Sequence, residues 1–441
     1  MLFSFLTYLQ PTHYFQCFSK SGKSIFPLAD QLPEQLLDQL PIDKRYDSDR
    51  AKDYDIAWRA IQMGYVGDVK TYTEFEELSV KDNYLFLRKN FHAAWVFYVL
   101  CLRILQLKNP IKEISGWWRT RRVAQIKTIR SITDGTAWES FESPLIKEAP
   151  FVSVVIPTLN RYEYLEQILG DFEQQEYKNF EVIVVDQSDN FDPAFYDKFD
   201  LNINLLRQSE KALWLARNSA IETAKGSIIA LSEDDVRIQP DWIDMHLKCL
   251  DFFNAEVSAG VFYPEGQQIP KSRAFFARAT QFATGNSVLY RSVFNRVGLF
   301  DRQFEKQRMG DGEFGMRLYL NGIKSVSNPF GSCIDIKAGT GGLREMGSWD
   351  AFRPSKFFAP RPIPSVLYYF RRYFGNYRAR LAMLRTVPIS VFPYQFKKNK
   401  PLLLMGVLVT FLIFPIVLYQ VVRSWHLAGR KIKEGPIIPE L

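Results

Sequence analysis

The chain has 441 residues, of which 47% are apolar, so it is too long for one ordinary domain and can bury a large core. Its formal net charge of +8 predicts an anionic partner, and the basic residues concentrate at 119–122 and 361–400, beside apolar sequence. This distribution favours acidic membrane lipids over nucleic acid, and the four cysteines, scattered without the pairing of a zinc site, are typical of a reduced, cytosolic protein.

Residues 1–115 form an N-terminal region whose one recognisable feature is a residue pattern that recurs later in the chain, called the echo below. Asp53-Tyr-Asp-Ile-Ala-Trp-Arg59, followed by Gly64, has the same spacing as Asp311-Gly-Glu-Phe-Gly-Met-Arg317, followed by Gly322. This similarity has two possible explanations. The echo is either the back half of a second, inactive copy of the unit around Asp311, or a chance match between two amphipathic helices. The region begins without a basic leader and a long apolar core, so no secretory signal is expected.

Residues 116–150 are basic and then rich in Ser, Thr and Glu, and are expected to be a linker. The apolar run 151–156 that follows predicts a buried strand. This strand ends in a polar loop that contains Pro157, Thr158 and Arg161.

A helix and a second strand come next. Apolar residues at helical spacing between 162 and 172 predict the helix, and the apolar run 180–185 predicts a strand that ends at Asp186. This order is typical of a parallel sheet, whose ligands bind where the strands end. The glycine patterns of a dinucleotide fold and of a P-loop do not occur in the first turn, which argues against dehydrogenases and P-loop enzymes.

A further apolar run ends in three successive acids, Glu233, Asp234 and Asp235, called the acidic triplet below. Adjacent carboxylates repel each other, so this arrangement is unfavourable unless a cation or hydrogen-bond donors neutralise it. Hard oxygen ligands at this density suit Mg²⁺ or Mn²⁺, which commonly bridge to a diphosphate. The alternative is a solvated acidic turn, and the neighbouring motifs favour the metal site.

Five short motifs in a fixed order resemble a family-2 glycosyltransferase of the GT-A fold. They lie at 154–161, at 182–186, at 216–218 with 233–235, at 284–286 with 298–301, and at 310–317. The resemblance covers residues 151–345, less than half of the chain. It implies an α/β fold, with a Rossmann-like, mixed, mainly parallel sheet flanked by helices.

The resemblance implies a nucleotide-sugar site with Mn²⁺ or Mg²⁺ as cofactor. Asp235 would be the direct metal ligand, with Glu233 and Asp234 holding metal-bound water or ribose, although a glutamate stands where the family usually has aspartate. Asp186 would hold the base or the ribose. The other donor-binding residues implied are Pro157, Thr158, Arg161, Arg217, Thr284, Gly285, Asn286 and Arg344. For Arg217 a structural ion pair with the acidic triplet is equally open, and the glycine-rich stretch 337–344 is either a lid over the diphosphate or a connector.

The acceptor hydroxyl must lose a proton as it attacks the sugar, so a general base is needed. By resemblance this base is Asp311, and Glu313 is the acid that follows it. The alternative is that both acids simply favour the first turn of a helix. A single base without a second nucleophilic carboxylate implies one displacement, with inversion at the anomeric carbon.

The C-terminal part is expected to contact a membrane. Residues 346–399 are expected to be a basic, aromatic interfacial segment, in which residues 365–385 interleave aromatic and basic side chains and predict a helix in the headgroup layer. Residues 400–422 form an uncharged apolar stretch after Lys400, long enough for a transmembrane helix, or for a re-entrant hairpin bent at Pro415. A buried soluble helix is the alternative. Residues 423–441 are expected to be a basic tail.

These features predict a metal-dependent, inverting glycosyltransferase that acts on a glycan or lipid-linked acceptor, in assembly of a bacterial surface polysaccharide. The expected location is the cell inner membrane, with the catalytic domain, residues 151–345, on the cytoplasmic face. A processive polysaccharide synthase is disfavoured, because no Gln-x-x-Arg-Trp motif occurs and one apolar span cannot form a channel. A scaffold that only binds glycan or membrane is the other alternative.

Overall fold

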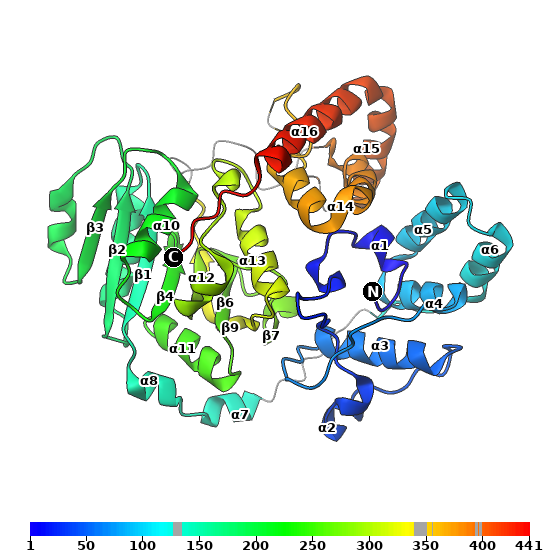
Figure 1. Cartoon of the computed structure of the whole chain (residues 1–441), viewed down its shortest axis with the longest axis horizontal. Coiled ribbons are helices and arrows are strands. Elements are labelled where there is room, and N and C mark those ends of the chain that lie inside the picture. Colours follow the sequence, from blue (N-terminus) through cyan, green and yellow to red (C-terminus); the bar gives the residue numbers. More distant parts are fainter. Residues whose placement is uncertain (127–134, 339–350, 355, 393–395, 397–398) are drawn as a thin grey trace. The chain divides into compact units, whose positions relative to one another are not determined.

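The computed structural model describes residues 1–126, 135–338, 351–354, 356–392, 396 and 399–441 (Figure 1). The chain divides into two units. The helical unit comprises residues 1–132 and 369–421, and the sheet unit comprises residues 133–368 and 422–441. Each is described separately below.

The sheet unit is built on one mixed sheet, which has nine strands among the described residues. The strand order is β3-β2-β1-β4-β8-β6-β9-β5, and β7 pairs with β9. The longest pairings, β1 with β2 and β6 with β9, are parallel, while β8 runs antiparallel to both of its neighbours. The strands are β1 Val152–Thr158, β2 Phe180–Asp186, β3 Ile203–Arg207, β4 Ile228–Ser232, β5 Val236–Arg237, β6 Val257–Pro264, β7 Ala277–Arg278, β8 Asn286–Tyr290 and β9 Ser325–Asp335. The predicted α/β fold with a mixed, mainly parallel sheet is confirmed.

Helices flank this sheet and close its core. The predicted helix after the first strand is α9, and its apolar positions, from Leu165 to Phe172, are fully buried against the strands. The longer helices are α9 Tyr162–Glu173, α10 Leu213–Thr223, α11 Trp242–Phe252, α12 Ser292–Val297 and α13 Gly310–Leu320. Short 3₁₀ helices lie at Pro193–Lys198, Lys271–Arg273 and Arg302–Phe304. The β1-α9-β2 order therefore brings the ends of β1, β2 and β4 to one edge of the sheet.

The second part of the expected linker is built into the sheet unit. Helices α7 Gly135–Ser140 and α8 Pro144–Glu148 lie there. The Trp138 ring stacks on Phe330 at 5.3 Å, and Ser143 Oγ donates to Asp251 at 2.6 Å. A segment with a fixed aromatic contact and a fixed hydrogen bond adds to the core of this unit.

The helical unit contains no strand among its described residues beyond an isolated bridge between Pro27 and Thr71. Its helices are α1 Leu6–Leu9, α2 Glu34–Leu37, α3 Asp49–Gln62, α4 Val80–Asn90, α5 Ala93–Leu105, α6 Pro110–Arg119 and α15 Lys400–Leu412, with 3₁₀ helices at Tyr14–Gln16, Ala29–Gln31 and Pro388–Ser390. Helix α14 Pro364–Thr386 changes direction at Gly375, where φ is 76°, and helix α16 is Phe414–Glu434. Both helices begin in one unit and end in the other.

The echo between the two units extends to their side-chain contacts. In the helical unit Arg59 pairs with the buried Asp55 at 2.9 Å and donates to the carbonyl of Pro41. In the sheet unit Arg317 pairs with the buried Glu313 at 3.0 Å and donates to the carbonyl of Leu299. Each acid precedes its arginine by one helical turn.

The two segments also agree in their turns. Gly64 and Gly322 both end their helices with a left-handed backbone, at φ 95° and 71°. The segments 41–64 and 299–322 thus share a local fold at one constant offset along the chain. A common origin by duplication stays a prediction.

No single helix among the described residues is long and apolar enough to cross a bilayer. The stretch expected to be a span is broken at Ile413, and its two helical parts, Met405–Leu412 and Phe414–Glu434, meet at 88°. Only when the two helices are taken together are they long and apolar enough, by length and composition, to span a bilayer.

The end of the expected basic tail is held in the sheet unit. The Leu299 and Arg302 amides donate to the carbonyls of Pro439 and Ile437, each at 2.9 Å. The Ile437 amide in turn donates to Asp301 Oδ1 at 2.9 Å. Residues 437–439 are therefore an ordered edge of this unit, beside the 298–301 motif.

Candidate active site

The acidic triplet follows β4, and its middle member is the most buried. Asp234 accepts a hydrogen bond from Thr158 Oγ1 at 2.8 Å and pairs with Arg161 Nη1 at 3.0 Å. The same Arg161 nitrogen lies 3.1 Å from Asp235. Burial raises the pKa of Asp234 to about 6, against the effect of the Arg161 charge. The structure thus brings Thr158 and Arg161, from the end of β1, onto two acids at the end of β4.

Glu233, the first member, is held by a different arginine. Arg217 of α10 is completely buried, and its Nη2 lies 3.6 Å from Glu233 Oε1. Arg217 Nη1 also donates to the carbonyl of Thr284. A Cβ at Gly285 would come within 2.5 Å of the Glu233 side chain, so only glycine lets this loop lie against the acid. Arg217 therefore ties the Thr284 loop to the triplet.

Asn286 belongs to the support of this loop. Its side chain is fully buried at the start of β8, and its Oδ1 accepts from Trp242 Nε1 at 2.9 Å. His246 Nε2 lies 3.1 Å from the same oxygen. Burial lowers the pKa of His246 to about 4, so the imidazole is neutral at pH 7. The structure places Asn286 in a buried polar network that fixes the position of Gly285.

Asp335 is an acid near the triplet that the sequence analysis missed. It is the last residue of β9, and burial, followed by the charges of Asp235 and Glu233, raises its pKa. The Ala338 amide, just beyond it, donates to Asp235 Oδ2 at 3.3 Å. The rule that acids at strand ends converge would have found it, had 325–335 been recognised as a strand.

Among the described residues, no three His, Cys, Asp or Glu side chains are arranged as a complete metal site. Asp335 lies close enough to Asp235 and Glu233 for their charges to raise its pKa. Such a set offers one or two hard oxygen ligands to a divalent cation whose other ligands come from phosphate and water.

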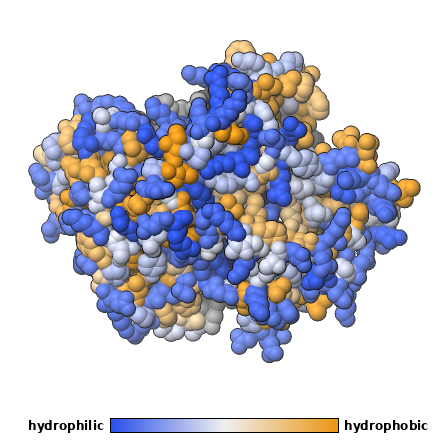
Figure 2. Space-filling view, in the orientation of Figure 1, coloured by the Kyte–Doolittle hydropathy of each residue, from blue (hydrophilic) through white to orange (hydrophobic). Residues whose placement is uncertain are grey.

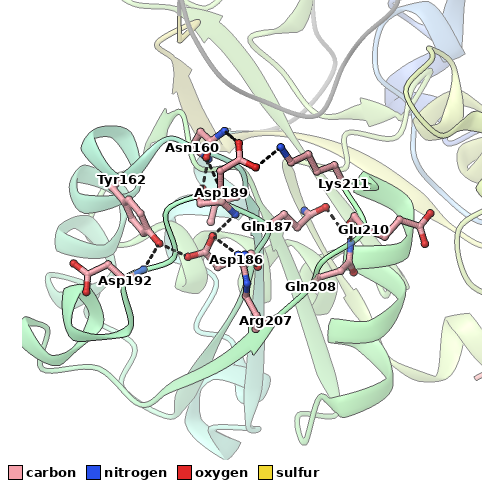
Figure 3. Close-up of polar contacts among 12 residues, drawn as sticks. Asn160, Tyr162, Asp186, Gln187, Asp189, Asp192, Arg207, Gln208, Glu210 and Lys211 are labelled. Atoms are coloured by element: carbon pink, nitrogen blue, oxygen red, sulfur yellow. Dashed lines mark hydrogen bonds and ion pairs between the residues drawn. The ribbon is translucent and has the colours of Figure 1, made fainter.

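Asp186 lies in a separate polar cluster at the end of β2, and Figure 3 shows its carboxylate directed at the Tyr162 hydroxyl. It accepts from Tyr162 Oη at 2.5 Å, from Tyr196 Oη at 2.9 Å and from the Ser188 amide at 2.8 Å. Arg207 lies 4.0 Å away. Asp186 is fully buried, and both of its carboxylate oxygens accept hydrogen bonds from protein groups.

The side-chain amide of the next residue, Gln187, has its oxygen held by two hydrogen bonds, whereas its nitrogen has no hydrogen-bond partner among the described residues. Its Oε1 accepts from the Ala212 amide at 2.7 Å and from Gln208 Nε2 at 3.0 Å (Figure 3). Its Nε2 is buried and has no hydrogen-bond partner among the described residues. This donor was not singled out from the sequence, where a glutamine carries no special signal.

The two acids of α13 have different surroundings. Asp311 is exposed in the first turn, where it accepts from the Gly312 amide at 3.0 Å. Glu313 is completely buried, with both oxygens 3.0 Å from Arg317 Nε. The structure keeps Asp311 available to a substrate and commits Glu313 to an internal ion pair, so the sequence-based catalytic role is supported by position for Asp311 alone.

Helix α10 joins the start of α13 to the acidic triplet. Trp214 packs so closely on Gly310 that a Cβ there would overlap its ring. Arg217, one turn later on the same face of α10, contacts Glu233. One face of α10 therefore contacts both the first residue of α13 and the first acid of the triplet. Arg344 and residues 339–344 of the possible lid lie outside the described residues.

Residues 153–304 match the family model described as Glycosyl transferase family 2. Curated relatives include the glycosyltransferase GlyA of Streptococcus pneumoniae, 25% identical over 163 residues, covering 36% of this chain and 22% of that protein. The glycosyltransferase AglE of Haloferax volcanii is 27% identical over 168 residues, covering 35% of this chain and 53% of AglE. The chain thus spans about half of one relative and less of the other.

Among solved structures, the 1–349 fragment of S. aureus TarS in complex with UDP-GlcNAc is similar, with 15% identity and a TM-score of 0.42. The similarity covers 64% of this chain and 92% of that one.

Proposed function

We propose that this chain, which contains a glycosyl transferase family 2 domain, transfers a sugar from a nucleotide-diphosphate donor to a glycan or a lipid-linked acceptor. The observation that carries the proposal is the convergence of Thr158 and Arg161 on Asp234 and Asp235 where β1 and β4 end. This edge of the sheet is where an open α/β sheet binds its ligand.

The chain's own residues suit a diphosphate held through a divalent cation. Glu233, Asp235 and Asp335 would supply hard carboxylate oxygens, and a cation would offset the repulsion that Asp335 experiences from the other two acids. Mn²⁺ and Mg²⁺ need only one or two such ligands when phosphate supplies the others. When bound, the ion would neutralise the leaving diphosphate as a Lewis acid.

Nucleotide recognition would use the other strand ends. Asp186 fixes Tyr162 and Tyr196 around the end of β2, and Gln187 presents a buried amide donor in the same region. Arg161 bridges two acids and would reposition to meet phosphate oxygens, because guanidinium forms bidentate contacts with either group.

Asp311 would act as the general base. It is exposed at the start of α13, beside the Trp214 face of α10, and would take the proton from the acceptor hydroxyl as that oxygen attacks the anomeric carbon. The proposed mechanism is a single displacement with inversion at the anomeric carbon, in which Asp311 acts only as the base.

The proposed setting is polysaccharide assembly at the cell inner membrane, with the sheet unit on the cytoplasmic face. Its support is the bent apolar pair of α15 and α16 and the basic aromatic sequence before it. Acidic lipids would then be a partner of the chain.

The test is binding and turnover with defined donors. We expect UDP-, GDP- or dTDP-sugars to raise the melting temperature of the purified chain when manganese is present, and one of them to be consumed with an acceptor. A chain that no nucleotide stabilises, or that binds a donor without ever breaking its glycosidic bond, would support a binding scaffold instead.

A further inference from the structure

Helices α5 and α6 of the helical unit form a hairpin with an exposed apolar surface. On α5 the exposed apolar residues Phe97 and Ile104 are two helical turns apart, Leu105 at the end of the helix is 76% exposed, and Leu107 in the connecting turn is 92% exposed. Figure 2 shows apolar atoms on the surface over this hairpin. The surface, called the hairpin surface below, consists of Phe97, Ile104, Leu105, Leu107, Ile111, Ile114 and Trp118.

This surface is additional to the face that each helix already buries. Helix α5 buries Val96, Val99 and Leu100. Helix α6 buries Glu113 and Gly116 against α4, where a Cβ at position 116 would lie 3.0 Å from Val80. The packing of both helices is therefore complete without the exposed side chains, so folding of this unit does not require the hairpin surface.

The exposed charges on the hairpin segment itself, residues 93–126, are all positive. The single acid between residues 93 and 126 is Glu113, which is buried and accepts from Tyr84 Oη at 2.8 Å and from Arg103 Nη2 at 2.5 Å. The exposed cations on the same stretch are Lys108, Lys112, Arg119, Arg121 and Arg122. No acid forms an ion pair with these five among the described residues. An apolar surface with an uncompensated positive rim complements an apolar layer beneath anionic headgroups.

The aromatic residues fit the same environment. Trp118 is exposed next to Arg121, whose guanidinium lies 4.1 Å from its ring centre. Tryptophan and arginine side chains with this arrangement place the ring at the headgroup level and the charge among phosphates.

We propose that the α5–α6 hairpin docks this chain onto the surface of an acidic lipid bilayer. Helix α5 has 13 residues and measures about 20 Å, which is shorter than the hydrocarbon layer of about 30 Å, so the hairpin lies in the interface and does not cross it. The apolar turn at Leu107 enters the acyl boundary and the five cations stay with the phosphates. This contact is separate from the C-terminal apolar segment and does not depend on the proposed transfer reaction.

The experiment measures partition of the full chain onto vesicles. To isolate the hairpin, the three most exposed large apolar side chains among the described residues of α15 are first replaced in the background variant Leu408→Gln, Phe411→Gln, Leu412→Gln. Binding is then compared on phosphatidylcholine vesicles with and without phosphatidylglycerol. We expect the background variant to bind the acidic vesicles, and the further changes Leu105→Gln, Leu107→Gln and Ile111→Gln to reduce binding at least tenfold.

Charge variants and controls sharpen the test. Replacing Lys108, Lys112 and Arg122 by Gln should weaken binding to acidic vesicles by about fivefold for each cation and leave binding to neutral vesicles unchanged. Ile42→Gln, at an exposed apolar position elsewhere in the unit, is the matched control and should have no effect. All variants should keep the wild-type melting temperature and its increase with donor, because none touches the core or the candidate active site.

Two results would overturn the proposal. The first is unchanged vesicle binding by both the apolar and the charge variants. The second is a dimer in solution, detected by light scattering, that the apolar substitutions convert to a monomer while vesicle binding stays the same. The second outcome would identify the surface as an interface between two copies.

Discussion

At the scale of single residues, the candidate active site pairs three acids with two arginines in a largely buried environment. Arg161 compensates Asp234 and Asp235, Arg217 compensates Glu233, and each arginine also restrains a loop or strand end. Such compensation lets three adjacent acids persist at the end of a buried strand, where unpaired carboxylates would be costly. The same acids then present oxygens to a cation.

Asp235→Asn should abolish sugar transfer and weaken nucleotide binding in the presence of manganese, because the diphosphate would be held through the cation on that carboxylate. Calorimetric titration with the nucleoside diphosphate, with and without manganese, measures the effect. Asp197→Asn, at an exposed acid of the same unit, is the control. Full activity of Asp235→Asn, or of the wild type in excess chelator, would contradict the metal-dependent mechanism.

Asp311→Asn should reduce turnover by roughly two to four orders of magnitude and leave donor affinity nearly intact, because a general base acts in the chemical step. Steady-state kinetics on the purified variant separates kcat from KM. A collapse of donor affinity with normal turnover would place Asp311 in the nucleotide pocket instead.

Glu313→Gln should lower the stability of the fold and leave turnover nearly unchanged. Removing one partner of its buried pair with Arg317 leaves an uncompensated charge in the core, at a cost of about 3 to 5 kcal/mol in unfolding free energy. Denaturant titration measures this loss. The fraction that stays folded should turn over normally, and a specific loss of kcat without loss of stability would restore a catalytic role for Glu313.

His246 should make stability depend on pH. Burial lowers its pKa to about 4, below the unfolded value of about 6.5, so the unfolded state binds more protons in this range. Its contribution is therefore present above pH 6.5 and is lost as the pH falls towards 4, by up to about 3 kcal/mol. His246→Gln should be less stable at pH 7 and show a flatter profile of unfolding free energy between pH 4 and 7. An unchanged slope in this variant would assign the effect to other groups, such as His13, whose pKa is also lowered to about 4.

At the scale of elements, the site depends on helices and on a chain end that lie far apart in the sequence. Helix α10 contacts the start of α13 through Trp214 and the triplet through Arg217, so one helix positions both halves of the proposed reaction centre. Residues 437–439 hydrogen-bond to the backbone before α13 and to Asp301. The C-terminal residues therefore support the loop that leads to Asp311.

Deleting residues 436–441, which keeps Gly435, should destabilise the sheet unit by about 2 to 4 kcal/mol, because three hydrogen bonds of about 1 kcal/mol each are lost together with the contact of Ile438 beside Gly298. Thermal unfolding of the truncated chain measures the loss. Deleting only residues 440 and 441, which keeps these bonds, is the matched control and should be neutral. An equal effect of both deletions would show that the hydrogen bonds contribute little.

At the scale of the whole molecule, the match to the Glycosyl transferase family 2 model covers residues 153–304, and most of the exposed large apolar side chains among the described residues belong to the helical unit. The exposed large apolar side chains gather on the α5–α6 hairpin and on α15 with the start of α16. This distribution makes the helical unit the natural candidate for membrane contact.

The background variant Leu408→Gln, Phe411→Gln, Leu412→Gln should move part of the full chain from the membrane to the soluble fraction of cells. The remainder should be released by salt, because attraction between basic residues and acidic lipid is screened over about 8 Å at physiological ionic strength. Fractionation in low and high salt measures both parts. Substitution is preferable to deleting residues 400–441, which would also remove the contacts of residues 437–439. A chain that is soluble without detergent before any change would contradict the proposed membrane location.

The sequence by itself determined three central strands of the sheet and the acidic site at their ends. Apolar runs that end in polar residues predicted β1, β2 and β4, and parallel strand ends meet at one edge, so Thr158, Arg161 and the triplet could be placed together without a structure. Periodicity likewise predicted α9. These features are encoded locally, by hydrophobic pattern and by residues adjacent in sequence.

Only the tertiary structure decided which polar residues face a ligand and which support the fold. Asp311 and Glu313 stand two residues apart on one helix, yet Glu313 is buried against Arg317 and Asp311 is exposed, because the contacts of α13 with residues 297–299 select one face. Asp335 reaches the triplet and Ile437 reaches Asp301 through pairings distant in sequence. Such partners depend on the packing of the whole unit, since a local pattern specifies how a segment folds but not which distant segment covers it.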